Sequence, residues 1–284
     1  MNKGTVVVTG TSTGIGESTA ANLVANGFRV FGGVRRTEDG TRLRSCLGKA
    51  FTPLIMDVTD GDTIAANVAE VETALGNATL NGLVNNAGIA IGGPTVLLPL
   101  DDFRHQLEVN LLGALAVTQA FLPLLGTDRA RTGDPGRIIN VSSVSGKRAM
   151  PFMAPYSASK HALEAVSESL RCELMLFGID VIIVAPGIVA TPIWKKAQDI
   201  ATTPYENSEY APALSRLLAY VLDIGPRGDP PERIARVIFE ALTKPSPKTR
   251  YAPVRGKFKN WILPTLLPKR YIDRKIARGL GLVK

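Results

Sequence analysis

Along this chain, short β-branched segments alternate regularly with longer segments of helical pattern. The short segments read as buried strands, at residues 5–9, 29–34, 51–56, 80–84, 137–141 and 180–185. Helical patterns fall between them, at residues 18–26, 60–75, 100–125 (one long helix or two) and 158–177. Apolar strands separated by helices predict a parallel sheet covered on both faces. With right-handed crossovers, this predicts an α/β fold, a doubly wound parallel sheet of the Rossmann type.

The sequence predicts one domain followed by a C-terminal extension. Its 284 residues, 45% of them hydrophobic, suffice for a large core and are too apolar for a disordered protein. No linker divides residues 1–256. Within them, residues 190–231 are interrupted by prolines, which is typical of a lid, and a helix to residue 242 and a strand at 249–254 follow. Residues 257–284 read as a basic amphipathic extension.

The formal net charge of +8 is concentrated at the C-terminal end. Residues 244–284 carry 12 Lys and Arg against one acid, a net +11, so the preceding residues must sum to −3. A body without a basic face argues against nucleic-acid binding. Two separated cysteines and two histidines argue against a disulfide scaffold and against a bound metal. With no secretory signal and no apolar run of about 20 residues, we expect a cytoplasmic protein.

A glycine-rich segment lies directly between the first predicted strand and the first predicted helix. It reads Thr9-Gly10-Thr11-Ser12-Thr13-Gly14-Ile15-Gly16. Glycines here permit a tight turn and let backbone N–H groups approach a pyrophosphate at the helix N-terminus. An ordinary turn could have this composition, but its place after the first strand favours a dinucleotide site. The spacing GxxxGxG differs from the commoner GxGxxG, and no Gly-Lys-Ser/Thr follows, which excludes a P-loop.

A tyrosine and a lysine are spaced four residues apart after the fifth predicted strand. On a helix, Tyr156 and Lys160 would share one face. Ser143 lies just past that strand, at the sheet edge where ligands bind in such folds. Ser142 is its rival, and strand alternation sends the two side chains to opposite faces. Asn110 lies in a helical segment, where a short amide is a poor helix former. Each of these patterns, taken alone, is common by chance.

Taken in order, these motifs resemble those of the short-chain dehydrogenase/reductase family. The resemblance runs from about residue 6 to residue 191 and includes TGxxxGIG, the NNAG at 85–88 and the PGIVAT at 186–191. It implies a dinucleotide-binding catalytic domain over residues 1–256.

The resemblance also implies four catalytic residues. Tyr156 would exchange a proton with the substrate oxygen, and Ser143 would bind that oxygen where charge develops. A free tyrosine has a pKa near 10, but Lys160 and an oxidised cofactor would both favour its phenolate. Lys160 would also hold the nicotinamide ribose, and Asn110 a water that relays protons. The family's spacing of thirteen residues before Tyr156 favours Ser143 over Ser142.

The end of the second predicted strand bears on the choice of cofactor. Val34 stands where family members that use NAD carry an aspartate, and Arg35 and Arg36 follow it. A carboxylate there would bind a free ribose 2′-hydroxyl, whereas guanidinium groups pair with a 2′-phosphate. Two solvated arginines would look the same, and Glu38 and Asp39 lie close by. We expect NADP(H), with NAD(H) as the alternative.

The resemblance implies further cofactor contacts at the ends of the predicted strands. The complete set of implied cofactor-binding residues is Gly10, Thr11, Ser12, Thr13, Gly14, Ile15, Gly16, Arg35, Arg36, Asp57, Val58, Asn86, Ala87, Gly88, Tyr156, Lys160, Pro186, Gly187, Val189 and Thr191. Asp57 could equally cap a turn, and the other segments could be plain turns.

The C-terminal part bears a looser resemblance to the retinol and hydroxysteroid dehydrogenase branch of the family, at residues 248–251, 266–268 and Asp273. This implies hydroxyl–carbonyl interconversion by hydride transfer on a hydrophobic alcohol or ketone, such as a steroid, retinoid or lipid. The alternatives are reduction of small ketones or of 3-oxoacyl thioesters. A non-enzymatic nucleotide-binding or membrane-associated protein is the weaker alternative, because the Ser–Tyr–Lys set is complete.

Two features predict partners. The helix at 158–177 is apolar over more than one side, which predicts a covering second copy, in a homodimer or homotetramer as in the family. In the extension, apolar residues alternate with cations around Trp261. That pattern suits peripheral contact with an anionic membrane surface, or a roof over the substrate pocket. A helix packed on its own domain with its cations in water would show the same pattern.

Overall fold

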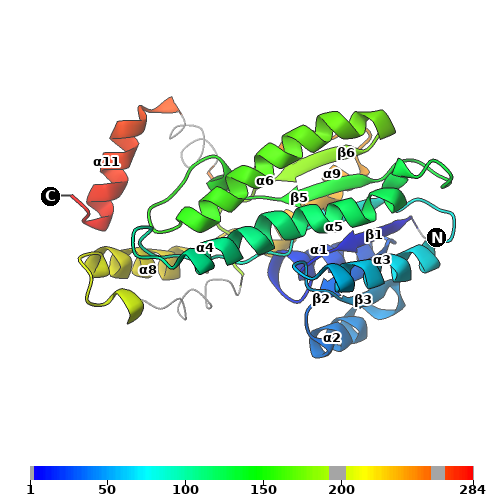
Figure 1. The fold of residues 1–284 in the computed structure, drawn as a ribbon, viewed down its shortest axis with the longest axis horizontal. Coiled ribbons are helices and arrows are strands. Elements are labelled where there is room, and N and C mark those ends of the chain that lie inside the picture. The colour runs from blue at the N-terminus through cyan, green and yellow to red at the C-terminus, as the bar shows by residue number, and fades with distance from the viewer. Residues whose placement is uncertain (1–2, 192–202, 257–265, 284) are drawn as a thin grey trace.

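The computed structural model describes residues 3–191, 203–256 and 266–283. Its centre is one seven-stranded sheet, ordered β3-β2-β1-β4-β5-β6-β7 (Figure 1). All its strand pairs are parallel. The strands are β1 (Thr5–Val8), β2 (Arg29–Val34), β3 (Phe51–Ile55), β4 (Gly82–Asn85), β5 (Arg137–Val141), β6 (Asp180–Val184) and β7 (Arg250–Tyr251). The predicted doubly wound parallel α/β sheet is therefore confirmed.

The strand order reverses direction beside β1. The chain first moves outward through β2 to β3, then returns to pair β4 with the other side of β1. Ligands of open α/β sheets bind at such a reversal, beyond the carboxyl ends of the strands. Proline occurs at Pro53 because β3 is an edge strand, where a missing N–H costs no ladder bond.

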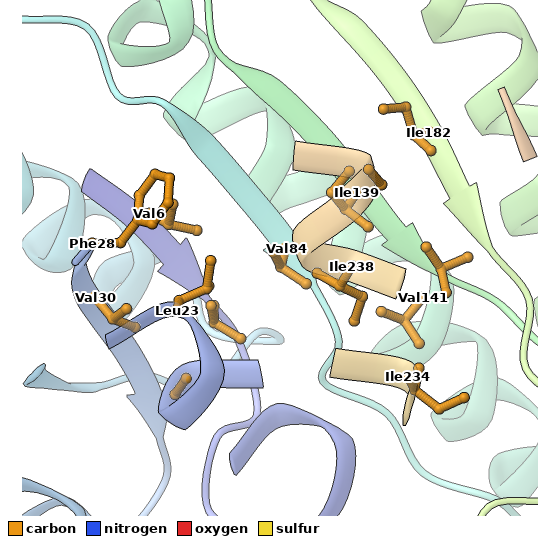
Figure 2. Close-up of a cluster of buried hydrophobic side chains, with 14 of the residues drawn as sticks. Val6, Leu23, Phe28, Val30, Val84, Ile139, Val141, Ile182, Ile234 and Ile238 are labelled. Carbon is orange, nitrogen blue, oxygen red and sulfur yellow. The ribbon is translucent and has the colours of Figure 1, made fainter. Parts of the chain in front are cut away.

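Helices cover both faces of the sheet. On one face, α1 (Gly14–Ala25) and α9 (Pro231–Thr243) pack Leu23 and Ile238 onto the strands. Figure 2 shows this cluster, in which Val6, Val84 and Ile139 come from neighbouring strands. On the other face lie α3 (Gly61–Leu75), α5 (Gly113–Leu122) and α6 (Ala154–Glu173). Two-sided burial explains why the strands are apolar at most positions.

The long apolar segment between β4 and β5 forms one continuous helical run, Leu100–Thr127. It consists of α4 (Leu100–Leu107), a π turn (Glu108–Leu112), α5 and a second π turn (Pro123–Thr127). By length and composition alone it could cross a membrane. Its fully buried Val117 and Phe121 instead belong to the core between helices and sheet. This run is therefore a core helix of the α/β domain.

The extents of α1 and α6 differ from those predicted, and α2 was not predicted. α1 begins at Gly14 and α6 at Ala154, each four residues before the prediction, so Tyr156 lies in the first turn of α6. Pro155 suits that first turn, because proline lacks only an N–H that the helix would leave unpaired. α2 (Thr37–Leu47) buries only Gly40 and Leu43, so its sequence carries too weak an apolar pattern to read.

A third group of elements lies at one end of the molecule, away from α2 and α3 (Figure 1). It comprises α8 (Ala211–Ile224), within the predicted lid, and α11 (Lys269–Leu280), within the predicted extension. Residues 192–202 of the lid and 257–265 of the extension, including Trp261, lie outside the described residues. The small cluster that joins the group consists of Phe152, Tyr205, Ala213, Leu214 and Leu280. The predicted final strand is shorter than expected, because only Arg250–Tyr251 pairs with β6.

Candidate active site

The glycine-rich loop turns tightly from β1 into α1. Gly10 and Gly14 have φ of +67° and +63°, a conformation that favours glycine. A Cβ on Gly16 would lie 2.1 Å from the Gly10 carbonyl oxygen, so no larger residue fits there. The N-cap residue, Thr13, makes no side-chain hydrogen bond to the helix. The N-cap side chain therefore does not bond to the first N–H groups of α1, and these groups form a cradle suited to an anion.

The predicted NNAG segment holds this loop from the neighbouring strand end. The Asn86 side-chain amide donates to the carbonyl oxygens of Thr9 and Gly10, at 3.0 Å each. In return the Thr9 hydroxyl accepts the backbone N–H groups of Asn86 and Ala87, also at 3.0 Å. A Cβ on Gly88 would lie 3.2 Å from Asn110 Oδ1, so this segment also approaches the helical run closely.

Thr11 anchors the other side of the loop. Its backbone N–H and its hydroxyl both donate to the Gly33 carbonyl oxygen, at 2.9 and 3.1 Å. The side chain is fully buried. Of the loop residues predicted to contact a cofactor, Thr11 therefore uses its side chain to hold the loop against β2.

The predicted adenosine end carries charged residues at the ends of β2 and β3. Arg35 and Arg36 are exposed, and Arg36 Nε lies 3.1 Å from Asp39 Oδ2. The Asp57 carboxylate accepts the N–H and hydroxyl of Thr59, at 2.9 and 2.7 Å. These bonds, with a smaller contribution from the nearby Arg35 charge, lower the pKa of Asp57. Val58, beside it, is buried.

Arg42 was not predicted, because α2 was not. Its guanidinium donates to the Ser12 carbonyl oxygen at 2.7 Å and pairs with Glu17 of α1 at 2.7 Å. It thereby adds a cation beside the glycine-rich loop. The sequence could have indicated this role for Arg42 only if α2 had been predicted, because that helix carries Arg42 back to the glycine-rich loop.

Asn110 lies in the first π turn and is buried. Its Oδ1 accepts the Ile89 N–H at 2.8 Å, and its Nδ2 donates to the Ile89 carbonyl at 3.0 Å and to Ser159 Oγ at 3.2 Å. Ser159 in turn donates to the Tyr156 carbonyl oxygen at 2.7 Å. Gln106, which sequence reasoning missed, binds the same chain segment through the Ile89 carbonyl at 2.9 Å. The helical run thus fixes the segment after β4 to the first turn of α6.

The structure brings Ser143, Tyr156 and Lys160 together at the end of β5. The Ser143 hydroxyl lies close enough to the Tyr156 hydroxyl to lower the pKa of the phenol. Lys160 Nζ lies 5.9 Å from the centre of the Tyr156 ring and donates to the Val141 carbonyl oxygen at 2.8 Å. Ser142 turns away from this group, as alternation predicts, and donates to Glu164 at 3.1 Å.

Burial acts on both ionisable groups of this cluster. It raises the pKa of Tyr156, although the nearby Ser143 hydroxyl works in the opposite direction. It lowers the pKa of Lys160 to about 8. In the chain alone, the phenol of Tyr156 therefore keeps its proton at neutral pH. The acidic phenol expected from the neighbouring lysine is not a property of the protein by itself, because desolvation is the larger effect.

The segment after β6 closes over the start of α1. The Pro186 carbonyl accepts the Val144 N–H at 3.0 Å, and the Gly187 N–H donates to Pro253 at 3.2 Å. Val189 forms an isolated parallel bridge with Asp229. A Cβ built on Gly14 would lie 3.1 Å from Thr191 Cγ2, so Thr191 lies beside the glycine-rich loop.

A Rossmann-type sheet with these groups along one edge defines the class of dinucleotide-binding α/β proteins. Within that class, the chain belongs to the short-chain dehydrogenase family, whose model matches residues 4–201. A short-chain dehydrogenase structure from Streptomyces avermitilis superposes with a TM-score of 0.76, at 27% identity, over 99% of this chain and 97% of that one.

Two relatives match nearly the whole chain. An "NADPH-dependent 3-dehydrocapnine reductase" of Ornithobacterium rhinotracheale is 37% identical over 276 residues, 96% of both proteins. Retinol dehydrogenase 5 of Mus musculus is 32% identical over 287 aligned residues, 94% of this chain and 86% of that protein. The predicted resemblance to the family, and to its retinol dehydrogenase branch, is confirmed. The chain is a member of an oxidoreductase family.

Proposed function

We propose that this protein is an NADP(H)-dependent oxidoreductase that interconverts a hydroxyl group and a carbonyl group on a hydrophobic substrate. One observation carries the proposal: the Ser143 hydroxyl lies close enough to that of Tyr156 to lower its pKa, and the Lys160 ammonium lies beside the same ring. Two hydroxyls and a cation at the carboxyl edge of the sheet can bind and protonate one carbonyl oxygen. Catalytic roles for Asn110, Ser143, Tyr156 and Lys160 are part of this proposal.

The glycine-rich loop fits a dinucleotide. Positive φ at Gly10 and Gly14, and the absence of a Cβ at Gly16, leave room for a pyrophosphate against the start of α1. Val34 supplies no carboxylate at the end of β2, and exposed Arg35 and Arg36 follow it. The relative named as NADPH-dependent supports the same cofactor, so we favour NADP(H) over NAD(H). When bound, the nicotinamide supplies or accepts the hydride.

The residues of the chain would handle the proton and the substrate oxygen. Tyr156, which burial keeps protonated, donates its proton to the oxygen of a carbonyl during reduction. Ser143 donates a hydrogen bond to the same oxygen as negative charge develops there. Lys160 holds the nicotinamide ribose and restores the proton. Asn110 supports a water relay from Lys160 to solvent.

An aromatic pair that begins four residues before Tyr156 favours a hydrophobic substrate. Phe152, four residues before Tyr156, packs edge-on against Tyr210 at 6.0 Å between ring centres. Its backbone has φ of +64°, which a bulky residue adopts only when its surroundings hold it. The relatives named as acting on retinol and on 3-dehydrocapnine support a substrate larger than a small ketone.

The α11 surface supports the peripheral membrane contact that we propose for this cytoplasmic protein. Its exposed cations are Lys269, Arg270, Arg274, Lys275 and Arg278. Tyr271 and Leu282 add exposed apolar surface, so the segment can contact both headgroups and acyl chains. We expect the protein to float with vesicles containing anionic lipid at low salt and to remain behind at high salt. Equal flotation with neutral vesicles would contradict this electrostatic contact.

The proposed activity is tested by following NADPH and NADH absorbance with steroid, retinoid, long-chain 3-oxo and small ketone substrates. We expect turnover of the bulky hydrophobic carbonyls with NADPH. Tyr156→Phe is expected to abolish turnover and to keep NADPH binding, measured by fluorescence, within about twofold, because only one hydroxyl is removed. Turnover by Tyr156→Phe at the wild-type rate would refute the proposal.

A further inference from the structure

A buried carboxylate that the proposed reaction does not use lies one helical turn beyond Lys160. Glu164, on α6, is 1% exposed. Arg250 of β7 binds it through two guanidinium nitrogens, Nη2 at 2.8 Å from Oε1 and Nε at 3.1 Å from Oε2. Lys147 Nζ lies 3.3 Å from Oε2. A charge at this depth persists only when it is paired and hydrogen-bonded. Glu164 has three such partners, namely Arg250, Lys147 and Ser142.

Successive turns of α6 contact successive residues at the end of β5. Lys160 donates to the Val141 carbonyl oxygen at 2.8 Å. Glu164 accepts the Ser142 hydroxyl at 3.1 Å. The next residue along the strand end is Ser143, whose hydroxyl lies beside that of Tyr156 and lowers its pKa. The position of the Ser143 hydroxyl therefore depends on how α6 holds the two residues before it.

The same carboxylate also contacts the chain after Ser143. Lys147 follows the short 3-10 turn Val144–Gly146, and its ammonium pairs with Glu164. A Cβ on Gly146 would lie 2.7 Å from Glu164 Oε1, so the turn lies directly against the carboxylate. Glu164 thus binds the loop at Ser142, on one side of Ser143, and at Lys147, on the other.

We propose that Glu164 is a positioning residue, which fixes the Ser143 hydroxyl opposite Tyr156 by holding both ends of residues 142–147. Arg250 holds the carboxylate in turn, so the edge strand β7 takes part in ordering the site. This inference rests on the proposed carbonyl reduction. A displacement of about 1 Å in a reacting group can cost about a hundredfold in rate, so loss of this support should reduce turnover.

The test compares variants by steady-state kinetics of carbonyl reduction. Glu164→Gln keeps the shape of the side chain and removes its charge. We expect kcat to fall by about tenfold or more, with KM for NADPH changed by less than about twofold. The kcat–pH profile should shift to higher pH, because a displaced Ser143 hydroxyl no longer lowers the pKa of Tyr156. A purely structural ion pair would lower the unfolding temperature without changing kcat per NADPH-binding site or its pH profile.

Two further variants sharpen the comparison. Glu168→Gln is the matched control, because Glu168 pairs with the same Lys147 at 3.5 Å but is half exposed, and the described contacts give it no bond to Ser142. It should retain wild-type kcat. Ser142→Ala keeps the ion pairs of Glu164 and removes one tie to the loop. It should lower kcat by several-fold, and it decides the matter if Glu164→Gln does not fold.

The outcomes separate this inference from the proposed function. Wild-type kcat and pH profile in a folded Glu164→Gln, or wild-type kcat in Ser142→Ala, would overturn the positioning role. A wild-type protein that turns over no carbonyl substrate would overturn the proposed function instead.

Discussion

In this site, the positions of single side chains depend on partners that lie far away in the sequence. Asn110 is an example: its motif position was readable, but its contacts with Ile89 and Ser159 exist only in the folded sheet. Glu164 is the opposite case. A glutamate on a helix reads as a solvated side chain, and only the approach of Arg250 from β7, 86 residues later, reveals a buried carboxylate. Motifs therefore located the candidate catalytic groups, whereas the residues that hold these groups in place could be identified only from the tertiary structure.

The buried lysine gives a prediction on pH. Burial lowers the pKa of Lys160 from 10.5 to about 8, so between these values the unfolded chain binds the additional proton. Through this residue, the free energy of unfolding therefore rises with pH over that range. The free energy of unfolding in urea, without cofactor, is measured for wild type and for Lys160→Met. We expect the wild-type value minus the variant value to be about 3 kcal/mol larger at pH 11 than at pH 7.

The exposed Lys244 provides the control for this measurement. Lys244→Met should follow wild type at both pH values, because its ammonium stays in water. A constant difference between wild type and Lys160→Met would mean that Lys160 is not desolvated.

Elements were predictable where burial imposes a period. The strands and the helices on the sheet faces follow apolar patterns, so their existence was read from sequence and only their ends moved. α2 escaped because it is mostly exposed, with Gly40 and Leu43 as its buried residues. α8 lies in a stretch whose prolines, Pro212 among them, read as a lid, although proline is well placed in the first turn of a helix.

The contact between α11 and α8 gives a prediction for an element. Leu280 is buried in the cluster with Leu214 and Phe152, whereas most of α11 is exposed. Leu280→Ala should therefore release α11, because it removes most of the buried apolar surface that this helix contributes. Trypsin should then cleave at Lys269 to Arg278 several times faster than in wild type, as followed by mass spectrometry.

Leu282→Ala is the comparison for this experiment, because Leu282 is 37% exposed. It should leave the cleavage rate unchanged. Equal rates in Leu280→Ala and wild type would show that Leu280 does not hold α11 in place.

For the whole molecule, the sheet topology was predictable and the partners remain predictions. The alternation of strands and helices allows few topologies besides a doubly wound sheet. The exposed outer side of α6 carries Ala165 and Cys172, and Leu176 follows it at 70% exposed. Exposed Glu168 and Ser169 share this side of the helix, so it is small and mixed in character. The pairing of this helix with its copy, in a homodimer or homotetramer, stays a prediction.

This surface leads to a prediction about assembly. A guanidinium at the centre of the α6 face would be buried without a partner, so Ala165→Arg should convert the oligomer into monomers. Sedimentation velocity measures the change directly. Glu70→Arg, at an exposed position on α3, should sediment like wild type. A wild type that sediments as a monomer at micromolar concentration would refute the predicted assembly.

The place of β4 between β1 and β5 has a consequence for biosynthesis. A ribosome releases the glycine-rich loop and the first four strands before it has made Ser143 or Tyr156. Because β5 pairs with β4, the early half supplies the template on which the later half is laid down. A nascent chain should therefore acquire its nucleotide cradle first and its chemistry last.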